Sequence, residues 1–348
     1  MTPQQVTTDQ FVTTAAVSAI EITVVRKADG LPLTKRISLA PDGSLRSDGS
    51  ACVMSRGTAW RFGFSRIGEL AELIEQFGPD QALALGGLRP DLPARVEVTT
   101  KHRLDGSTRP DLVARSREYI AYRSGQPAVA LIDYDIKGMP QGVADKITAL
   151  GGIWPALLSV IPALAGTARI LRKSTSAGLF RADTGEALPS SGGVHVFLTV
   201  RDGEDIERFL KTLHARCWLA GLGWMLVGAG GQLLERSIVD RVVGSPERLV
   251  FEGPPVLDPP LGQDKSSRQP VAIEGEVLDS IATCPPLTIL EQTLLQELHA
   301  KEAARLTPDA AAARMAFVAR QSQLLAQRTG MAPDLAARLI PGGRGLRK

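Results

Sequence analysis

Two acidic residues stand where a strand is expected to end. Residues 127–136 (PAVALIDYDI) are apolar and β-branched, and they place Asp133 and Asp135 at the end of the run. Because alternate residues of a strand share a face, we expect both carboxylates to point the same way. Such a pair repels unless a cation or proton neutralises it, and Mg²⁺ or Mn²⁺ prefer oxygen ligands. Taken alone, however, a D-x-D motif is more simply a strand-end cap or a set of salt-bridge partners.

A histidine follows a loop of small residues in the segment 190–200 (SSGGVHVFLTV). The amides of this loop and the hydroxyl of Ser191 could donate to a phosphate, and glycines let a ligand approach the backbone closely. His195, at the start of the expected strand, would add another donor. By itself, His195 is more typical of a half-buried structural histidine.

Further charged candidates lie on either side of this histidine. Asp240 is in the apolar alternation of residues 234–243 (LLERSIVDRV), and Arg248 is in a turn entering a strand at residues 245–251 (SPERLVF). Arg172 and Lys173 belong to residues 169–181 (RILRKSTSAGLFR), a basic stretch without an acidic residue. Singly, Asp240 could be a cap, and the basic residues could belong to a solvated face.

The surrounding segments predict the elements that hold these residues. Strands joined by turns are expected over residues 1–85, with one helix at 67–77 (IGELAELIEQF) that Gly78-Pro79 ends. Residues 253–286 are dense in proline and glycine, which indicates a long ordered loop or a domain boundary.

The composition changes after this loop and favours helices. We expect one helix at 287–306 and another at 308–327, with Thr307 as the cap and Pro308 in the first turn of the second. A basic run at 342–348 follows. The tail is therefore predicted to be a small helical unit.

One uncharged segment, residues 147–168 (ITALGGIWPALLSVIPALAGTA), is long enough to cross a bilayer. Pro155 and Pro162 interrupt it, and many of its apolar residues are alanine. We expect a short buried helix with Pro155 in its first turn that ends before Pro162, rather than a membrane span.

Composition restricts the remaining possibilities. The 348 residues, 44% hydrophobic and 22% charged, are typical of a folded soluble chain with one large domain or two ordinary ones. The net charge of +3 indicates no general attraction to polyanions, so any nucleic-acid site must be local. Three separated cysteines predict neither disulfides nor a cysteine zinc site. The first residues lack the features of a signal peptide, so we expect a cytoplasmic protein.

Taken in order, D-Y-D at 133–135, S-G-G-V-H at 191–195 and the isolated Asp240 resemble the three catalytic motifs of the archaeo-eukaryotic primase superfamily. The sequence looks most like the primase-polymerases of phages, plasmids and integrated elements. The phrases at 172–178 (RKSTSAG) and 245–251 are also similar to that branch. The resemblance covers residues 115–261 well and the ends poorly.

This resemblance implies an α+β fold whose catalytic core is related to the RNA-recognition fold, with an antiparallel sheet and flanking helices. The N-terminal strand-rich part of the catalytic domain would be residues 1–100, the core residues 101–286, and a helical tail residues 287–348. The implied activity is template-dependent primer synthesis on single-stranded DNA from nucleoside triphosphates, in replication of a mobile element.

The resemblance also implies roles for individual residues. Asp133, Asp135 and Asp240 match the metal-binding carboxylates, which would hold two Mg²⁺ or Mn²⁺ ions for nucleotidyl transfer. His195 matches the histidine that contacts the triphosphate of the incoming nucleotide, and Ser191 belongs to the same phosphate-holding motif. Charge and placement alone suggest phosphate contacts for three more residues, Arg172, Lys173 and Arg248.

Cellular members of the superfamily usually carry a zinc module, but this chain lacks zinc-ligand spacing, so no zinc is expected. It has no P-loop, so a helicase would be a separate protein or a missing part. No membrane partner is expected.

The same residues also allow other functions. A metal-dependent glycosyltransferase also uses D-x-D, although it leaves His195 and Asp240 unexplained. Repair polymerases of bacterial end joining share the same motifs and differ in role. A non-catalytic DNA-binding replication protein is the alternative from another class. A tyrosine-dependent nicking initiator lacks its His-x-His pair here.

Overall fold

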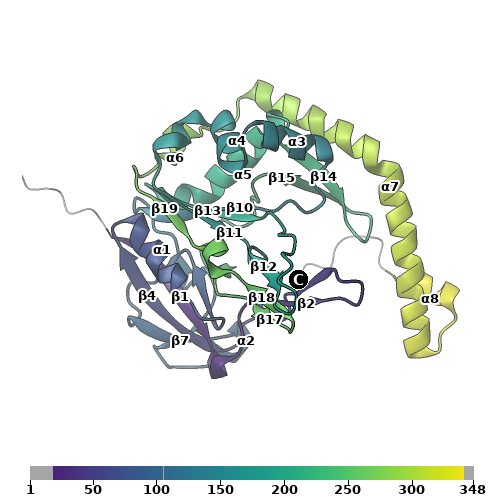
Figure 1. The fold of residues 1–348 in the computed structure, drawn as a ribbon, viewed down its shortest axis with the longest axis horizontal. Coiled ribbons are helices and arrows are strands. Elements are labelled where there is room, and N and C mark those ends of the chain that lie inside the picture. Colours follow the sequence, from purple (N-terminus) through teal and green to yellow (C-terminus); the bar gives the residue numbers. More distant parts are fainter. Residues whose placement is uncertain (1–18, 105, 341–348) are drawn as a thin grey trace, which may run out of the picture.

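The computed structural model describes residues 19–104 and 106–340 of the chain. This part is a mixed α+β structure with several antiparallel sheets, eight α-helices and a C-terminal helical unit (Figure 1). The expected α+β class and the helical tail are therefore confirmed.

The first sheet has six strands in the order β16-β5-β1-β4-β7-β8, antiparallel except for the parallel pair β7 and β8. The strands are β1 (Ile20–Lys27), β4 (Gly57–Phe64), β5 (Gln81–Ala84), β7 (Arg95–Thr99), β8 (Leu112–Ala114) and β16 (Leu249–Val250). Helix α1 (Ile67–Glu75) buries Leu70 and Ile74 in the core shared with this sheet. The helix predicted at 67–77 is therefore present, with its end two residues earlier.

The second sheet has four antiparallel strands in the order β10-β13-β11-β19. They are β10 (Ala128–Tyr134), β13 (Val194–Val200), β11 (Arg169–Lys173) and β19 (Val271–Ile273). Three helices, α3 (Gln141–Ala149), α4 (Ile153–Val160) and α5 (Ile206–Leu219), lie on one side of it, and the first sheet lies on the other (Figure 1). Buried side chains of both sheets and of α1, α4 and α5 form one continuous apolar core.

The two sheets are not consecutive in the sequence. Strands β8 and β16 lie beyond residue 100, yet both complete the first sheet, and Leu249 of β16 pairs with Ala84 of β5. The N-terminal sheet and the following region therefore fold as one interlocked unit.

Smaller strand pairs and short helices complete the fold. A three-stranded sheet has the order β17-β2-β3, and the two-stranded pairs are β12 with β18, β14 with β15, and β6 with β9. Their bounds are β2 (Arg36–Leu39), β3 (Leu45–Asp48), β6 (Gly87–Leu88), β9 (Ile120–Ala121), β12 (Leu179–Arg181), β14 (Gly223–Val227), β15 (Leu233–Ser237), β17 (Val256–Leu257) and β18 (Leu261–Gln263). The short α-helices are α2 (Lys101–Leu104) and α6 (Ser280–Thr283), and 3₁₀ helices lie at Ala28–Gly30, Pro162–Gly166, Gly203–Asp205 and Lys265–Arg268.

The uncharged segment at 147–168 forms the short helix that the prolines predicted. Helix α4 has Pro155 in its first turn and ends before Pro162. In the part of the chain that the structure describes, no single helix is long and apolar enough to cross a membrane. Helices α3 and α4 reach the required length and composition only together, and they meet at an angle of 87°.

The tail differs from the prediction of two helices separated at Thr307-Pro308. Helix α7 (Ile289–Thr329) runs unbroken for 41 residues with Pro308 inside it, and it bends as it crosses the molecule (Figure 1). Thr307 is not a cap, because its hydroxyl donates to the carbonyl of Ala303 one turn earlier. A proline removes one backbone hydrogen bond and kinks a helix, and here the helix continues past it.

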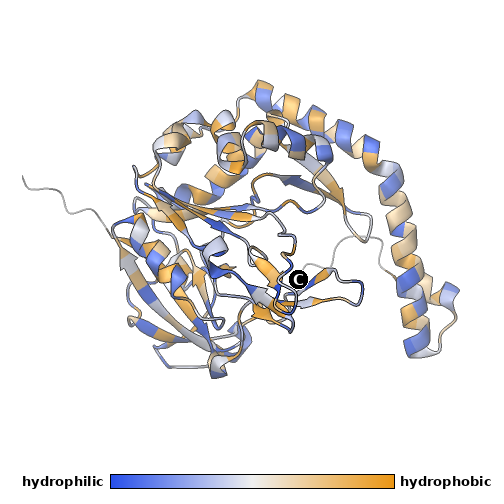
Figure 2. Cartoon of the chain, viewed as in Figure 1, coloured by the Kyte–Doolittle hydropathy of each residue, from blue (hydrophilic) through white to orange (hydrophobic). Residues whose placement is uncertain are grey.

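The real ends of α7 have strong local signals. Thr288 and Glu291 form a capping box at its start, and Gly330 ends it in the left-handed conformation. Helix α8 (Pro333–Leu339) then packs against α7. Hydrophilic and hydrophobic residues alternate along the whole visible length of α7 (Figure 2). The predicted basic run at 342–348 lies outside the described residues.

Candidate functional site

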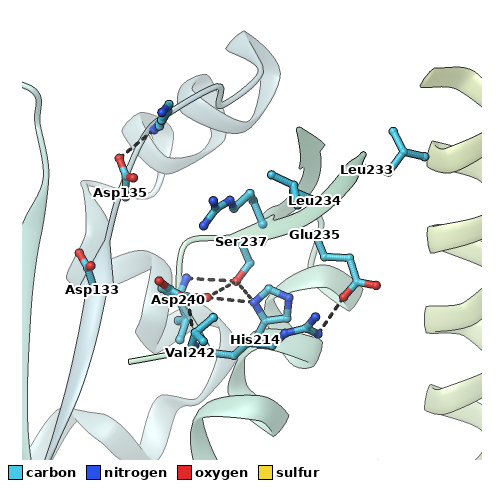
Figure 3. A pocket seen from close by; sticks show the side chains of 13 residues that line it. Asp133, Asp135, His214, Leu233, Leu234, Glu235, Ser237, Asp240 and Val242 are labelled. Carbon is cyan, nitrogen blue, oxygen red and sulfur yellow. Dashed lines mark hydrogen bonds and ion pairs between the residues drawn. The ribbon is translucent and has the colours of Figure 1, made fainter. Parts of the chain in front are cut away.

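Three predicted acidic residues meet around one pocket at the edge of the second sheet (Figure 3). Asp133 is the penultimate residue of β10, and Asp135 follows the strand. The backbone N–H of Asp240 donates to the carbonyl of Asp133 at 3.2 Å, so the segment after β15 lies beside β10. All three residues line a pocket of about 330 Å³.

The carboxylates of this pocket are not gathered into one ligand sphere. Asp135 Oδ1 accepts the backbone N–H of Lys137 at 3.0 Å, and Asp240 Oδ1 accepts that of Val242 at 2.9 Å. Within residues 19–104 and 106–340, no group of three or more His, Cys, Asp or Glu side chains is arranged to hold a metal ion. The donor types suit Mg²⁺ or Mn²⁺, but their arrangement is not that of a preformed metal site.

A buried polar cluster fixes the segment that carries Asp240 (Figure 3). Ser237 Oγ accepts the N–H of Val239 at 3.1 Å and lies 2.9 Å from Nδ1 of His214 on α5. The same histidine nitrogen is 2.9 Å from the carbonyl of Val239. His214 and Ser237 were not predicted as site residues, because they belong to no sequence motif and meet only in the fold.

His195 lies directly opposite Asp133 in the pairing of β10 with β13. Its Nε2 is 3.5 Å from Asp133 Oδ1, and its Nδ1 contacts the carboxylate of Glu252. Glu252 was not predicted. The signal available for it was an acidic residue directly after the apolar run of residues 249–251.

Arg172, for which charge and placement suggested a phosphate contact, is buried next to His195. It is the other cross-strand partner of His195, and only 7% of its side chain is exposed. Its Nε is 3.2 Å from Glu252 Oε2, and its Nη1 donates to the carbonyl of Ile74. The basic stretch at 169–181 therefore places this guanidinium in the core, with a buried carboxylate as its partner.

The charges of this cluster shift the pKa values of its members. Burial opposes the charged form of His195, but the charge of Glu252 and the hydrogen bond with Asp133 outweigh it and raise the pKa of His195 to about 10. Burial also acts to raise the pKa of Asp133, yet the hydrogen bond and charge of His195, with Lys35 and Arg248, hold that pKa below its usual value. An anionic Asp133, which lines the pocket, therefore lies next to a cationic His195 at neutral pH.

Ser191, four residues before His195 in the chain, belongs to a cluster of three hydroxyls. Its Oγ is 2.8 Å from that of Ser174 and 2.9 Å from that of Ser176, and its backbone N–H donates to Ser176 at 2.9 Å. The loop passes close to the end of β10, since a Cβ added at Gly193 would lie 3.3 Å from the carbonyl of Tyr134. The structure thus brings the predicted serine next to the strand of Asp133.

The other predicted cations are exposed around the same region. Lys173 ends β11 beside Ser174. Arg248 donates to the carbonyl of Val242 at 3.2 Å, and its charge acts on Asp133. Lys35, from the N-terminal region, acts on Asp133 as well. Its sequence context gave no sign of this proximity.

Comparisons with protein-family models, with curated proteins and with solved structures found no match for this chain. The geometry of the site is therefore what supports a function.

Proposed function

We propose that this chain is a template-dependent nucleotidyltransferase of the primase-polymerase class, which synthesises primers on single-stranded DNA. The supporting observation is the meeting of Asp133, His195 and Asp240. They come from three separate segments, and they adjoin through one cross-strand pair and one backbone hydrogen bond. Their order in the chain is the order of the three superfamily motifs.

The finer fold assignment is part of this proposal. A core related to the RNA-recognition fold needs an antiparallel sheet with helices packed on one side. Strands β10, β13 and β11, with α4 and α5 in the same core, are consistent with that arrangement. Asp133 and His195, paired at the end of β10 and the start of β13, would then face the substrate at this end of the sheet.

The groups around His195 suit a polyphosphate. The hydroxyl of Ser191, the imidazole of His195 and the exposed cations Lys173 and Arg248 would donate to or attract phosphate oxygens. Arg172 is not among these contacts in the proposal, since its guanidinium is occupied by Glu252.

The metal prediction, Mg²⁺ or Mn²⁺ held by Asp133, Asp135 and Asp240, belongs to the proposal. Such ions would supply a Lewis acid that stabilises negative charge on the transferred phosphate. The carboxylates do not form a ligand sphere in this structure. The steps assigned to the chain itself are therefore to bind and orient the triphosphate.

The test is a primer-synthesis assay on unprimed single-stranded DNA, with labelled ribo- and deoxyribonucleotides and Mg²⁺ or Mn²⁺. We expect short products from the parent and none from Asp133→Ala/Asp135→Ala. The matched control is Asp145→Ala, an exposed aspartate of α3 whose side chain accepts a hydrogen bond from Gln141. This variant should remain active.

Two outcomes would overturn the proposal. Template binding that survives Asp133→Ala/Asp135→Ala, without incorporation by the parent even on a primed template, would indicate a non-catalytic DNA-binding protein. Transfer from nucleotide sugars instead of nucleotides would indicate a glycosyltransferase.

A further inference from the structure

Glu252 has a carboxylate enclosed by three positively charged or ionisable groups. Only 1% of its side chain is exposed. One oxygen contacts Nδ1 of His195, and the other lies 3.2 Å from Arg172 Nε and 3.5 Å from Arg268 Nη2. Few positions in a folded chain hold a carboxylate so far from water.

The two arginines are themselves fixed by the backbone. Arg172 donates to the carbonyl of Ile74, at the end of α1, and Arg268 donates to the carbonyl of Glu252 at 3.0 Å. The Glu252 carboxylate therefore cannot turn away from His195 without breaking contacts on both guanidinium groups.

Such a cluster is a poor way to gain stability. Removing a carboxylate and two guanidinium groups from water costs several kcal/mol per ion, and apolar side chains of similar volume often stabilise a protein as well or better. A fully enclosed ionic cluster that directly contacts a candidate site residue is more readily explained by what it does to that residue.

The effect on His195 is geometric. With Nδ1 held by Glu252, the imidazole presents Nε2 to Asp133, which lines the pocket. The ring also meets Phe197 edge to face, with centroids 6.1 Å apart. A histidine held at one nitrogen has both its ring orientation and the role of its other nitrogen fixed.

We propose that Glu252 is a positioning residue, clamped by Arg172 and Arg268, that orients His195 so that Nε2 meets the triphosphate of the incoming nucleotide. This inference rests on the proposed function for the identity of the ligand. The orientation of His195 by Glu252 does not depend on it.

The first test uses the full unmodified chain. Nitrogen-detected NMR of the histidine rings resolves whether each ring nitrogen carries a proton and how fast that proton exchanges, and the chain has only 4 histidines. His195→Gln assigns the signal. We expect a slowly exchanging proton on Nδ1 of His195, and a ring without that proton, or one averaged between orientations, would overturn the proposal.

The second test is Glu252→Gln, with Glu276→Gln as the matched control at an exposed position. We expect the KM for nucleotide to rise about tenfold or more, the scale seen when a metal-bound histidine loses its outer hydrogen-bond partner. The kcat and the affinity for template should change little. The KM of Glu252→Asp should lie between those of the parent and Glu252→Gln. An unchanged KM together with an unchanged histidine spectrum would overturn the proposal.

The two tests separate the two claims. A parent that incorporates no nucleotide would overturn the proposed function, while the histidine spectrum still decides the role of Glu252. If Glu252→Gln does not fold, the spectrum of the unmodified chain gives that decision alone.

Discussion

The backbone N–H of Asp240 donates to the carbonyl of Asp133 at 3.2 Å. The stretch between these two residues is more than half of the predicted catalytic core, residues 101–286. The contact involves no side-chain atom. The position of Asp240 is therefore set by the main chain and by the cluster of His214 and Ser237 before it.

This relationship predicts that Asp240→Asn removes activity without unfolding the protein. Asparagine keeps an oxygen that can accept the N–H of Val242, so the free energy of unfolding should change by less than about 0.5 kcal/mol. Nucleotide incorporation should fall about a hundredfold or more, because a carboxylate of the proposed metal site loses its charge. Primer extension measures the activity, and urea denaturation measures the stability. A large loss of stability would contradict the expectation that Asp240→Asn leaves the fold intact.

The raised pKa of His195 predicts a loss of stability in mild alkali. The unfolded chain titrates near the ordinary value of about 6.5, whereas the folded chain titrates at about 10. The folded state therefore holds the proton more tightly. This contribution is complete below about pH 6.5 and is lost as the pH rises towards 10.

Denaturation of the parent and of His195→Gln between pH 7 and 10 measures this effect. The free energy of unfolding of the parent should fall more steeply than that of the variant. The comparison isolates His195, because the buried cysteines and tyrosines ionise in both proteins. Parallel curves would contradict the prediction.

Arg268→Met should be strongly destabilising. It leaves the buried carboxylate of Glu252 with one guanidinium fewer, and removing a partner from a buried ion pair costs about 3–5 kcal/mol. The control is Arg201→Met, whose exposed pair with Asp279 is worth less than about 1 kcal/mol. Equal midpoints in urea for the two variants would be inconsistent with an enclosed cluster.

Pro308→Ala should stabilise the tail. Pro308 is exposed within α7, and proline in a helix interior costs about 3 kcal/mol relative to alanine. We expect the free energy of unfolding to rise by about 1–3 kcal/mol, together with a straighter α7. Calorimetry and small-angle scattering would measure both, and a less stable variant would show that the bend itself is packed against the rest of the molecule.

Binding of single-stranded DNA should be sensitive to salt and weakly sensitive to sequence. The chain has only 3 tyrosines and 4 tryptophans to stack on bases, so contacts to the phosphate backbone should dominate. Fluorescence anisotropy with labelled oligonucleotides should show affinity falling steeply from low to moderate salt. An affinity that stays constant would exclude this mode of binding.

Local patterns predicted part of the site well. The apolar run before Asp133 and the small-residue loop before His195 placed both residues on strands, and the structure pairs those strands. The burial of Arg172 could not be predicted in this way. Its partner Glu252 lies far along the chain, and nothing near either residue specifies that they meet.

In the tail, a clear local signal predicted the wrong structure. Thr307-Pro308 is a good helix-start signal by local rules, but α7 passes through it. Helix α7 packs against β14, β15 and α8. Before Pro308, His299 pairs with Glu235 of β15, and after it the backbone of Ala310 lies against Gly231. Such packing on both sides offsets the local cost of one proline, which a short stretch of sequence does not reveal.

The pairing of β16 with β5 bears on how this protein can be divided. A fragment beginning at residue 101 would contain β8 and β16 without β7 and β5, their neighbours in the first sheet. Such a fragment would expose unpaired strand edges two residues before Glu252, and unpaired edges promote aggregation. The smallest fragment that keeps the site intact therefore begins at β1. Recombination or truncation at residue 100 would separate parts that fold only together.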